Sequence, residues 1–84
     1  MIVFTKHAED KFHLLKSHKF TITRHQVISA CSNPDLVDYA RLPLLIAQKQ
    51  RNKTHVLRVV YKQENSLKKI ITFYPGRAKH YAKT

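Results

Sequence analysis

The sequence is short of cysteine, glycine, proline and tryptophan. Its 84 residues contain one Cys, one Gly, three Pro and no Trp. A single cysteine, Cys31, cannot form an internal disulfide, which fits a reducing compartment. The scarcity of Gly and Pro excludes low-complexity linkers and a glycine-rich phosphate-binding loop. We therefore expect one domain that spans residues 1–84.

Long hydrophobic runs are also missing. No apolar stretch approaches the roughly 20 residues that a membrane-spanning helix needs. The first residues do not form a leader of about 15–30 residues with a charged and then an apolar part. We expect a cytoplasmic protein that does not enter a membrane. A chain this short buries only about 60–65% of its unfolded surface, which leaves no room for a deep cleft with a lid.

Negative charge is the third scarce feature. Five acidic residues stand against sixteen Lys and Arg, so the formal net charge is +11 with His neutral. Self-repulsion of this size destabilises a small fold. We expect a polyanionic partner, most often nucleic acid, whose phosphates bind Lys and Arg. An anionic membrane fits less well, since the basic residues are spread along the chain, and a generically basic small protein is the remaining alternative.

The first half of the chain has helical patterns. Apolar residues Ala8, Phe12 and Leu15 recur at helical spacing, which predicts a helix over residues 6–18. Thr23 and Gln26 have the spacing of a capping box and predict a second helix. Pro34 then stops that helix, because the residue before proline disfavours helical geometry.

The second half has strand patterns. The runs "LLIAQKQ", "HVLRVVYK" and "KKIITFY" are rich in β-branched and aromatic residues and are separated by the polar loops "RNKT" and "QENS". Such short connections imply antiparallel hairpins. Together with the starting "MIVF", the sequence predicts an α+β fold of order β-α-α-β-β-β. Two N-terminal helices would pack on one face of a small, mainly antiparallel sheet and leave the other face open.

Arg58 stands in the middle of the strand "HVLRVVYK". Strand alternation places Arg58 on the opposite side from Leu57, Val59 and Tyr61. A permanent cation among apolar neighbours is costly unless it is paired. Two interpretations follow: a contact to a phosphate, which we favour because carboxylates are so few, or a structural ion pair.

The first helix carries a second candidate group. His7 and Lys11 fall on one stripe with Leu14 and His18, beside the apolar stripe that faces the core. An imidazole with a pKa near 6.5 can donate or accept a proton at neutral pH. His7 is therefore either a proton-transfer group or an ordinary solvated histidine.

The C-terminal segment holds the densest set of candidates. Residues 66–84 contain five Lys or Arg and no acidic residue. Aromatic rings interleaved with cations suit single-stranded nucleic acid, because bases stack on the rings while cations follow the backbone. The "PG" after Tyr74 predicts a turn that folds the tail back across the last strand. A frayed, solvated terminus is the alternative. The candidates are Tyr74, Arg77, Lys79, His80, Tyr81 and Lys83.

The chain resembles the small toxin-like domains related to RelE/ParE and BrnT. The likeness runs along nearly the whole chain and is carried by "FTKHA", by "NPD" after the second helix, and by the closing strand with "YPGRAKHY". It implies a compact sheet-and-helix fold acting as the toxin of a type II toxin–antitoxin system. Members that resemble RelE and BrnT cut RNA, often messenger RNA on the ribosome, without a metal, and an acidic antitoxin neutralises them. Members like ParE poison gyrase instead.

Metal-independent RNA cleavage needs a base for the 2′-hydroxyl, cations for the charged phosphorane and an acid for the leaving oxygen. We assign base and acid to His7 or His80, and phosphate stabilisation to Arg58 and Arg77. No metal or other cofactor is expected, because the histidines and the lone cysteine lack metal-ligand spacing.

Other residues would contact the RNA. Tyr81 or Tyr74 would stack on a base or share proton transfer, and Lys11, Lys79 and Lys83 would bind the backbone. Glu64 falls in an expected loop, so the chain offers no candidate glutamate base on its strands, which argues against a glutamate-based ribonuclease mechanism. This interpretation requires Arg58, Arg77 and an imidazole to converge on one uncovered patch. A non-catalytic RNA-binding module and a gyrase poison remain alternatives.

Overall fold

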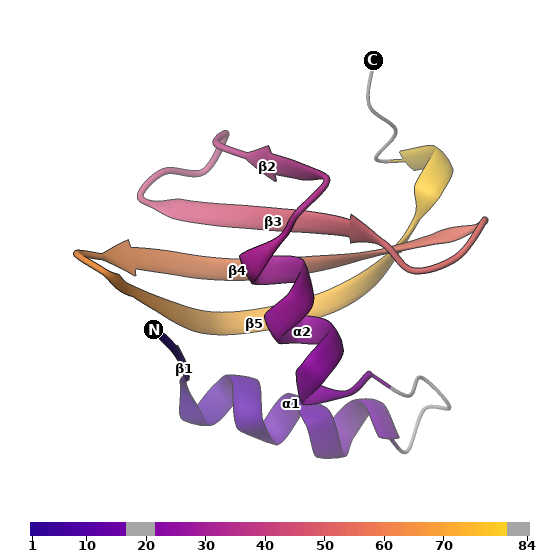
Figure 1. Cartoon of the computed structure of the whole chain (residues 1–84). Coiled ribbons are helices and arrows are strands. Elements are labelled where there is room, and N and C mark those ends of the chain that lie inside the picture. Colours follow the sequence, from indigo (N-terminus) through magenta and orange to yellow (C-terminus); the bar gives the residue numbers. More distant parts are fainter. Residues whose placement is uncertain (17–21, 81–84) are drawn as a thin grey trace.

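The computed structural model of the protein describes residues 1–16 and 22–80 (Figure 1). The chain order is strand, two helices, four strands and a final 3₁₀ turn. The elements are β1 (Ile2–Phe4), α1 (Lys6–Lys16), α2 (Arg24–Ser32), β2 (Leu36–Asp38), β3 (Leu44–Gln50), β4 (His55–Glu64), β5 (Leu67–Arg77) and η1 (Ala78–His80). No helix among these residues is long and apolar enough to cross a membrane.

The strands form one sheet in the order β1-β5-β4-β3-β2. β1 pairs with β5 in parallel, and the other three pairings are antiparallel. Both helices lie on the same face, with α2 crossing β3 and β4 and α1 running beside β5 (Figure 1). The predicted α+β class, mainly antiparallel sheet and one-sided helices are confirmed. The sheet has one strand more than expected, since the short β2 precedes β3.

The helix boundaries follow from local chemistry. Thr23 caps α2: its side chain accepts a hydrogen bond from the backbone N–H of Gln26, and the Gln26 side chain accepts one from the backbone N–H of Thr23. The predicted capping box is therefore confirmed, and α2 ends at Ser32, just before Asn33 and Pro34. At α1, the Thr5 hydroxyl accepts from the Ala8 N–H at 3.2 Å. The predicted end of this helix at residue 18 lies outside the described residues.

The core lies between the helices and the sheet. Ala8 of α1 and Cys31 of α2 are fully buried there, against Leu57, Val59 and Tyr61 of β4. The expected alternation along β4 is confirmed, because these three side chains face the helices. Cys31 is a core residue as predicted, and burial raises the pKa of its thiol, which makes it a poor nucleophile.

The predicted turn at "PG" is wrong. β5 continues through Pro75 and Gly76, which pair with Leu57 and Val56 of β4. The parallel partner β1 ends opposite Ile70, so proline sits where the outer side of β5 has no paired strand among the described residues. Proline is compatible with such an edge. The expected loop at Glu64 is also wrong, because β4 extends to this residue, which pairs with Leu67 of β5.

Candidate functional site

Arg58 lies on the helix-free face of the sheet, with only 5% of its surface exposed. Its guanidinium donates to the Tyr74 hydroxyl at 3.0 Å, to the Gln48 side-chain oxygen at 2.6 Å and to Asp38 Oδ2 at 3.0 Å. These partners come from β5, β3 and β2 on either side of β4. The structure thus shows the second of the two interpretations, a structural ion pair between Arg58 and Asp38. The candidate Tyr74 belongs to the same hydrogen-bond network.

Electrostatics stabilise this network. The backbone N–H of Ala40 and the Arg58 guanidinium hold the pKa of Asp38 below its usual value. Burial would lower the pKa of Arg58, but the Tyr74 hydroxyl and the Asp38 carboxylate outweigh it, so this pKa is raised. Arg58 therefore stays charged, and three of its N–H donors are directed at protein acceptors.

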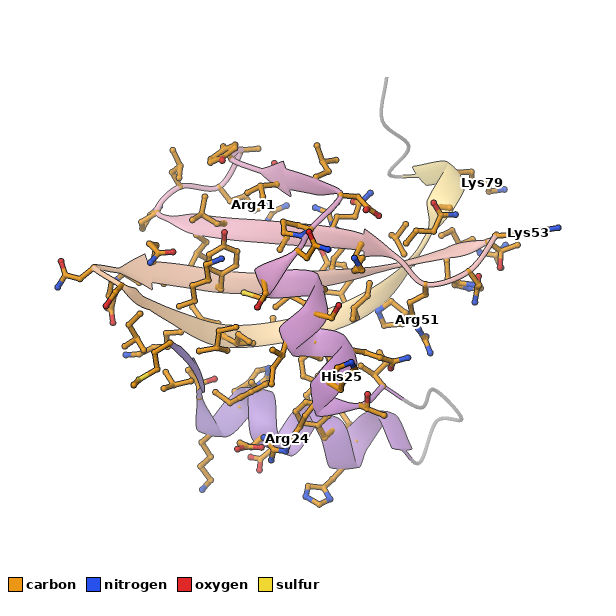
Figure 2. The ribbon with its side chains drawn as sticks, in the orientation of Figure 1. Arg24, His25, Arg41, Arg51, Lys53 and Lys79 are labelled. Atoms are coloured by element: carbon orange, nitrogen blue, oxygen red, sulfur yellow. The ribbon has the colours of Figure 1, made fainter. Side chains whose placement is uncertain are left out.

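A second group of cations gathers where β5 ends. Lys53 from the β3–β4 loop, Arg77 from β5 and Lys79 from η1 line a cavity of about 190 Å³ together with Thr54 and Ala78. The Ala78 N–H donates to the Thr54 carbonyl at 2.8 Å, which ties the loop to the start of η1. Figure 2 shows Lys53 and Lys79 at the same end of the sheet. We call these five residues the basic end; none of them is acidic.

His55 adds an imidazole beside the basic end. It pairs directly with Arg77 across β4 and β5, and such paired residues have Cβ atoms about 4.5–5.5 Å apart on the same face. Its Nδ1 lies 2.8 Å from the Thr54 hydroxyl, which fixes the ring. The side chain is half-buried. Sequence reasoning missed His55, because the expected turn at "PG" ended the strand before Arg77 could pair with it.

The other predicted residues do not all converge. His7 is exposed in the first turn of α1, where the Thr5 N–H donates to the Ile70 carbonyl of β5. Ile70 and Arg77 are seven residues apart along β5, roughly 23 Å at about 3.3 Å per residue. Lys11, half-buried, follows His7 one turn later on α1. The structure therefore places His7 away from Arg77, and it buries Arg58 in its own network on the helix-free face. The expected convergence of Arg58 and Arg77 with His7 on one uncovered patch is wrong.

Of the four candidates that follow Arg77, the structure describes the side chain of Lys79 only. Lys79 is exposed in η1, directly before His80. The His80 side chain, Tyr81 and Lys83 lie outside the described residues, so the expected pairing of Arg77 with an imidazole from His80 stays a prediction.

Three of the five carboxylates lie away from the basic end. Glu9 of α1 pairs with Arg24 of α2, and Asp38 pairs with Arg58. Glu64 lies 3.8 Å from Lys62 and 3.7 Å from Lys69 at the β4–β5 turn, which is the other end of these strands. Positive charge is therefore compensated elsewhere, and the basic end keeps a cationic surface.

Within residues 1–16 and 22–80, no three His, Cys, Asp or Glu side chains are grouped in a way that could hold a metal ion. Comparisons with protein-family models, with curated proteins and with solved structures each gave no match.

Proposed function

We propose that this protein binds RNA through the basic end. The observation that carries this proposal is the cavity of about 190 Å³ lined by Lys53, Arg77 and Lys79 without a carboxylate. Phosphates of a nucleic acid bind such cations and release counterions. Liquid water occupies about 30 Å³ per molecule, so the cavity has room for a phosphate group.

We further propose that the bound RNA is cleaved, as the resemblance to RelE- and BrnT-like toxins implies. A base removes the 2′-hydroxyl proton, this oxygen forms a bond to the adjacent phosphorus, and the bond to the 5′-oxygen breaks as an acid protonates that oxygen. Arg77 stabilises the extra negative charge on the phosphorane. DNA lacks the 2′-hydroxyl, which makes RNA the substrate.

Two histidines are candidates for proton transfer in this reaction. His55 is held opposite Arg77 by strand pairing, and His80 follows Lys79 in the chain with Tyr81 next to it. His55 is the cross-strand partner of Arg77, and His80 lies three residues after Arg77 in the chain. His7 instead follows Thr5, whose N–H donates to Ile70, seven residues before Arg77 on β5. We therefore assign proton transfer to His55 and His80, and a stacking or proton-sharing role to Tyr81.

The resemblance also implies a protein partner. An acidic antitoxin would neutralise the toxin in the cytoplasm, and the basic end is the surface we propose that it covers. Charge complementarity would speed its association.

Expression in a bacterial host tests the proposed activity. We expect the wild type to arrest growth and to shorten RNA lifetimes, and Arg77→Ala/Lys79→Ala to lose at least about 100-fold in cleavage rate, since removing a charge-stabilising group typically costs that much. The matched control is Lys6→Ala/Arg41→Ala, which removes two exposed cations from α1 and the β2–β3 loop. It should behave as the wild type. Equal toxicity of the two double variants would contradict the proposal.

A non-catalytic RNA-binding module is the second candidate. It is favoured by the commitment of Arg58 and Tyr74 to an internal network, which removes two groups from the expected catalytic set. Purified protein that binds RNA but leaves it intact after long incubation would select this function. DNA-damage signalling without RNA loss would instead select a gyrase poison like ParE.

A further inference from the structure

A second cavity, of about 160 Å³, lies between α2 and the end of β3. Its apolar floor consists of Ala30 and Leu57, which are 0% and 2% exposed. Its polar rim contains an imidazole, a hydroxyl, an ammonium and a guanidinium, from His25, Ser29, Lys49 and Arg51. No acidic side chain lines it. An apolar floor with a cationic rim suits a ligand that has one flat face and one negative group.

The fold preorganises this rim. His25 and Ser29 are four residues apart on α2 and so share one face of the helix. Lys49 pairs with Leu57 across β3 and β4 and therefore points to the same side of the sheet. Its Nζ donates to the Asn33 carbonyl at 3.0 Å, which holds the ammonium beside the end of α2. The nearby carboxylate of Asp35 accepts from a backbone N–H, that of Gln50, at 2.8 Å.

This cavity and the basic end lie on either side of the start of the β3–β4 loop. The Arg51 N–H donates to the His55 carbonyl at 3.0 Å, so the loop that carries Lys53 starts at the rim of this cavity. Leu57 lines one cavity and Thr54 the other, a separation of roughly 10 Å at about 3.3 Å per strand residue. Figure 2 shows His25 on α2 and Arg51 toward the end of the sheet where Lys53 lies.

We propose that this cavity receives one nucleotide of a single RNA strand whose neighbouring phosphates lie in the basic end. The proposal rests on the proposed RNA-binding function and adds where the strand runs. The base lies over Ala30 and Leu57 against the more exposed side chains of His25 and Ser29. Its phosphate meets Lys49 and Arg51. A volume of about 160 Å³ equals roughly five waters at about 30 Å³ each, which admits one base. Bases in a duplex are stacked and paired, so the partner is single-stranded.

Filling the cavity tests this proposal. Ser29→Tyr places a ring over the floor without changing charge, and Ser32→Tyr adds the same ring to an exposed position of α2 outside the cavity. We expect Ser29→Tyr to weaken binding of a labelled single-stranded RNA of about ten nucleotides by about tenfold in fluorescence anisotropy, about 1.4 kcal/mol, because the ring occupies the space of the base. Ser32→Tyr should stay within about twofold of the wild type.

A second pair of variants covers the case in which Ser29→Tyr does not fold. His25→Ala removes an exposed rim group, and His13→Ala is its control on the exposed side of α1. We expect His25→Ala alone to weaken binding by about threefold, about half the logarithmic loss predicted for Ser29→Tyr. A hairpin RNA of matched length should bind the wild type more weakly than the single strand.

The outcomes separate the two proposals. If the wild type binds no RNA, the proposed function fails and this inference falls with it. If Arg77→Ala/Lys79→Ala weakens RNA binding while Ser29→Tyr or His25→Ala binds like its control, only the cavity proposal is overturned. Equal affinity for the hairpin and the single strand would overturn it as well.

Discussion

At the scale of single residues, the pair of Arg58 and Asp38 explains how a cation can be buried in a sheet. The Arg58 side chain is 6% exposed and the Asp38 side chain 32%. An unpaired charge at the Arg58 position would be strongly destabilising, whereas a paired and hydrogen-bonded one is tolerated. The pair joins the edge strand β2 to β4, so its main role is to hold the edge of the sheet.

Asp38→Asn tests this role through pH. The pKa of Asp38 is lowered in the folded state, so its contribution to stability is complete above its unfolded pKa of about 3.9 and is lost as the pH falls below it. We expect Asp38→Asn to lower the free energy of unfolding by about 1–3 kcal/mol at pH 7. Between about pH 5 and pH 2, the free energy of unfolding should fall less for the variant than for the wild type.

Urea unfolding at several pH values measures both effects. Asp10→Asn is the control, since it removes one exposed carboxylate of α1 and changes the net charge equally. If Asp38→Asn and Asp10→Asn have the same unfolding free energy at pH 7, the ion pair does not stabilise the fold.

At the scale of elements, α2 depends on its capping box. Its nine residues are too few for an isolated helix to be stable in water, so the cap at Thr23 and packing on β3 and β4 hold it in place. Because α2 carries His25 and Ser29, its position also determines the shape of the second cavity.

Thr23→Ala should therefore destabilise the protein. We expect a loss of about 1 kcal/mol in the free energy of unfolding, the usual cost of removing an N-cap hydroxyl. Thr23→Ser keeps a hydroxyl and should stay within about 0.5 kcal/mol of the wild type. Chemical denaturation followed by far-UV circular dichroism measures both. A Thr23→Ala protein as stable as Thr23→Ser would show that the cap contributes nothing.

The same scale shows what the sequence can predict. The capping box, the boundaries of β3 and the alternation along β4 are local patterns, and the structure confirms them. The short strand β2 and the extension of β5 through Pro75 were missed, because both depend on a partner strand. Leu36 becomes a strand residue by pairing with Gln48, and Pro75 by pairing with Leu57. Tertiary pairing decides such segments more than their own composition does.

The candidate site was predictable to a smaller extent. Composition pointed to Arg77 and Lys79 as cations of an acid-free segment, and the structure brings both to one cavity. It could not predict that Lys53 joins them, since this depends on the register of β4 and β5. The partner of Arg58 could not be predicted either, because no local pattern marks a carboxylate twenty residues away in the chain.

At the scale of the whole molecule, charge is unevenly distributed. The net charge is +11, and four of the five carboxylates make hydrogen bonds or ion pairs on α1, near β2 or at the β4–β5 turn. The basic end lies at the opposite end of β4 and β5 from Glu64. Such a distribution gives the molecule a positive end that attracts a polyanion from a distance.

The salt dependence of RNA binding tests most directly whether the basic end contacts the RNA backbone. For single strands, the slope of log affinity against log salt changes by about 0.7 for each phosphate contact. We expect Arg77→Ala/Lys79→Ala to make the slope shallower by about 1.4 relative to the wild type, since it removes two contacts. Lys6→Ala/Arg41→Ala should keep the wild-type slope. If the two double variants change the slope equally, or neither changes it, the RNA is not bound at the basic end.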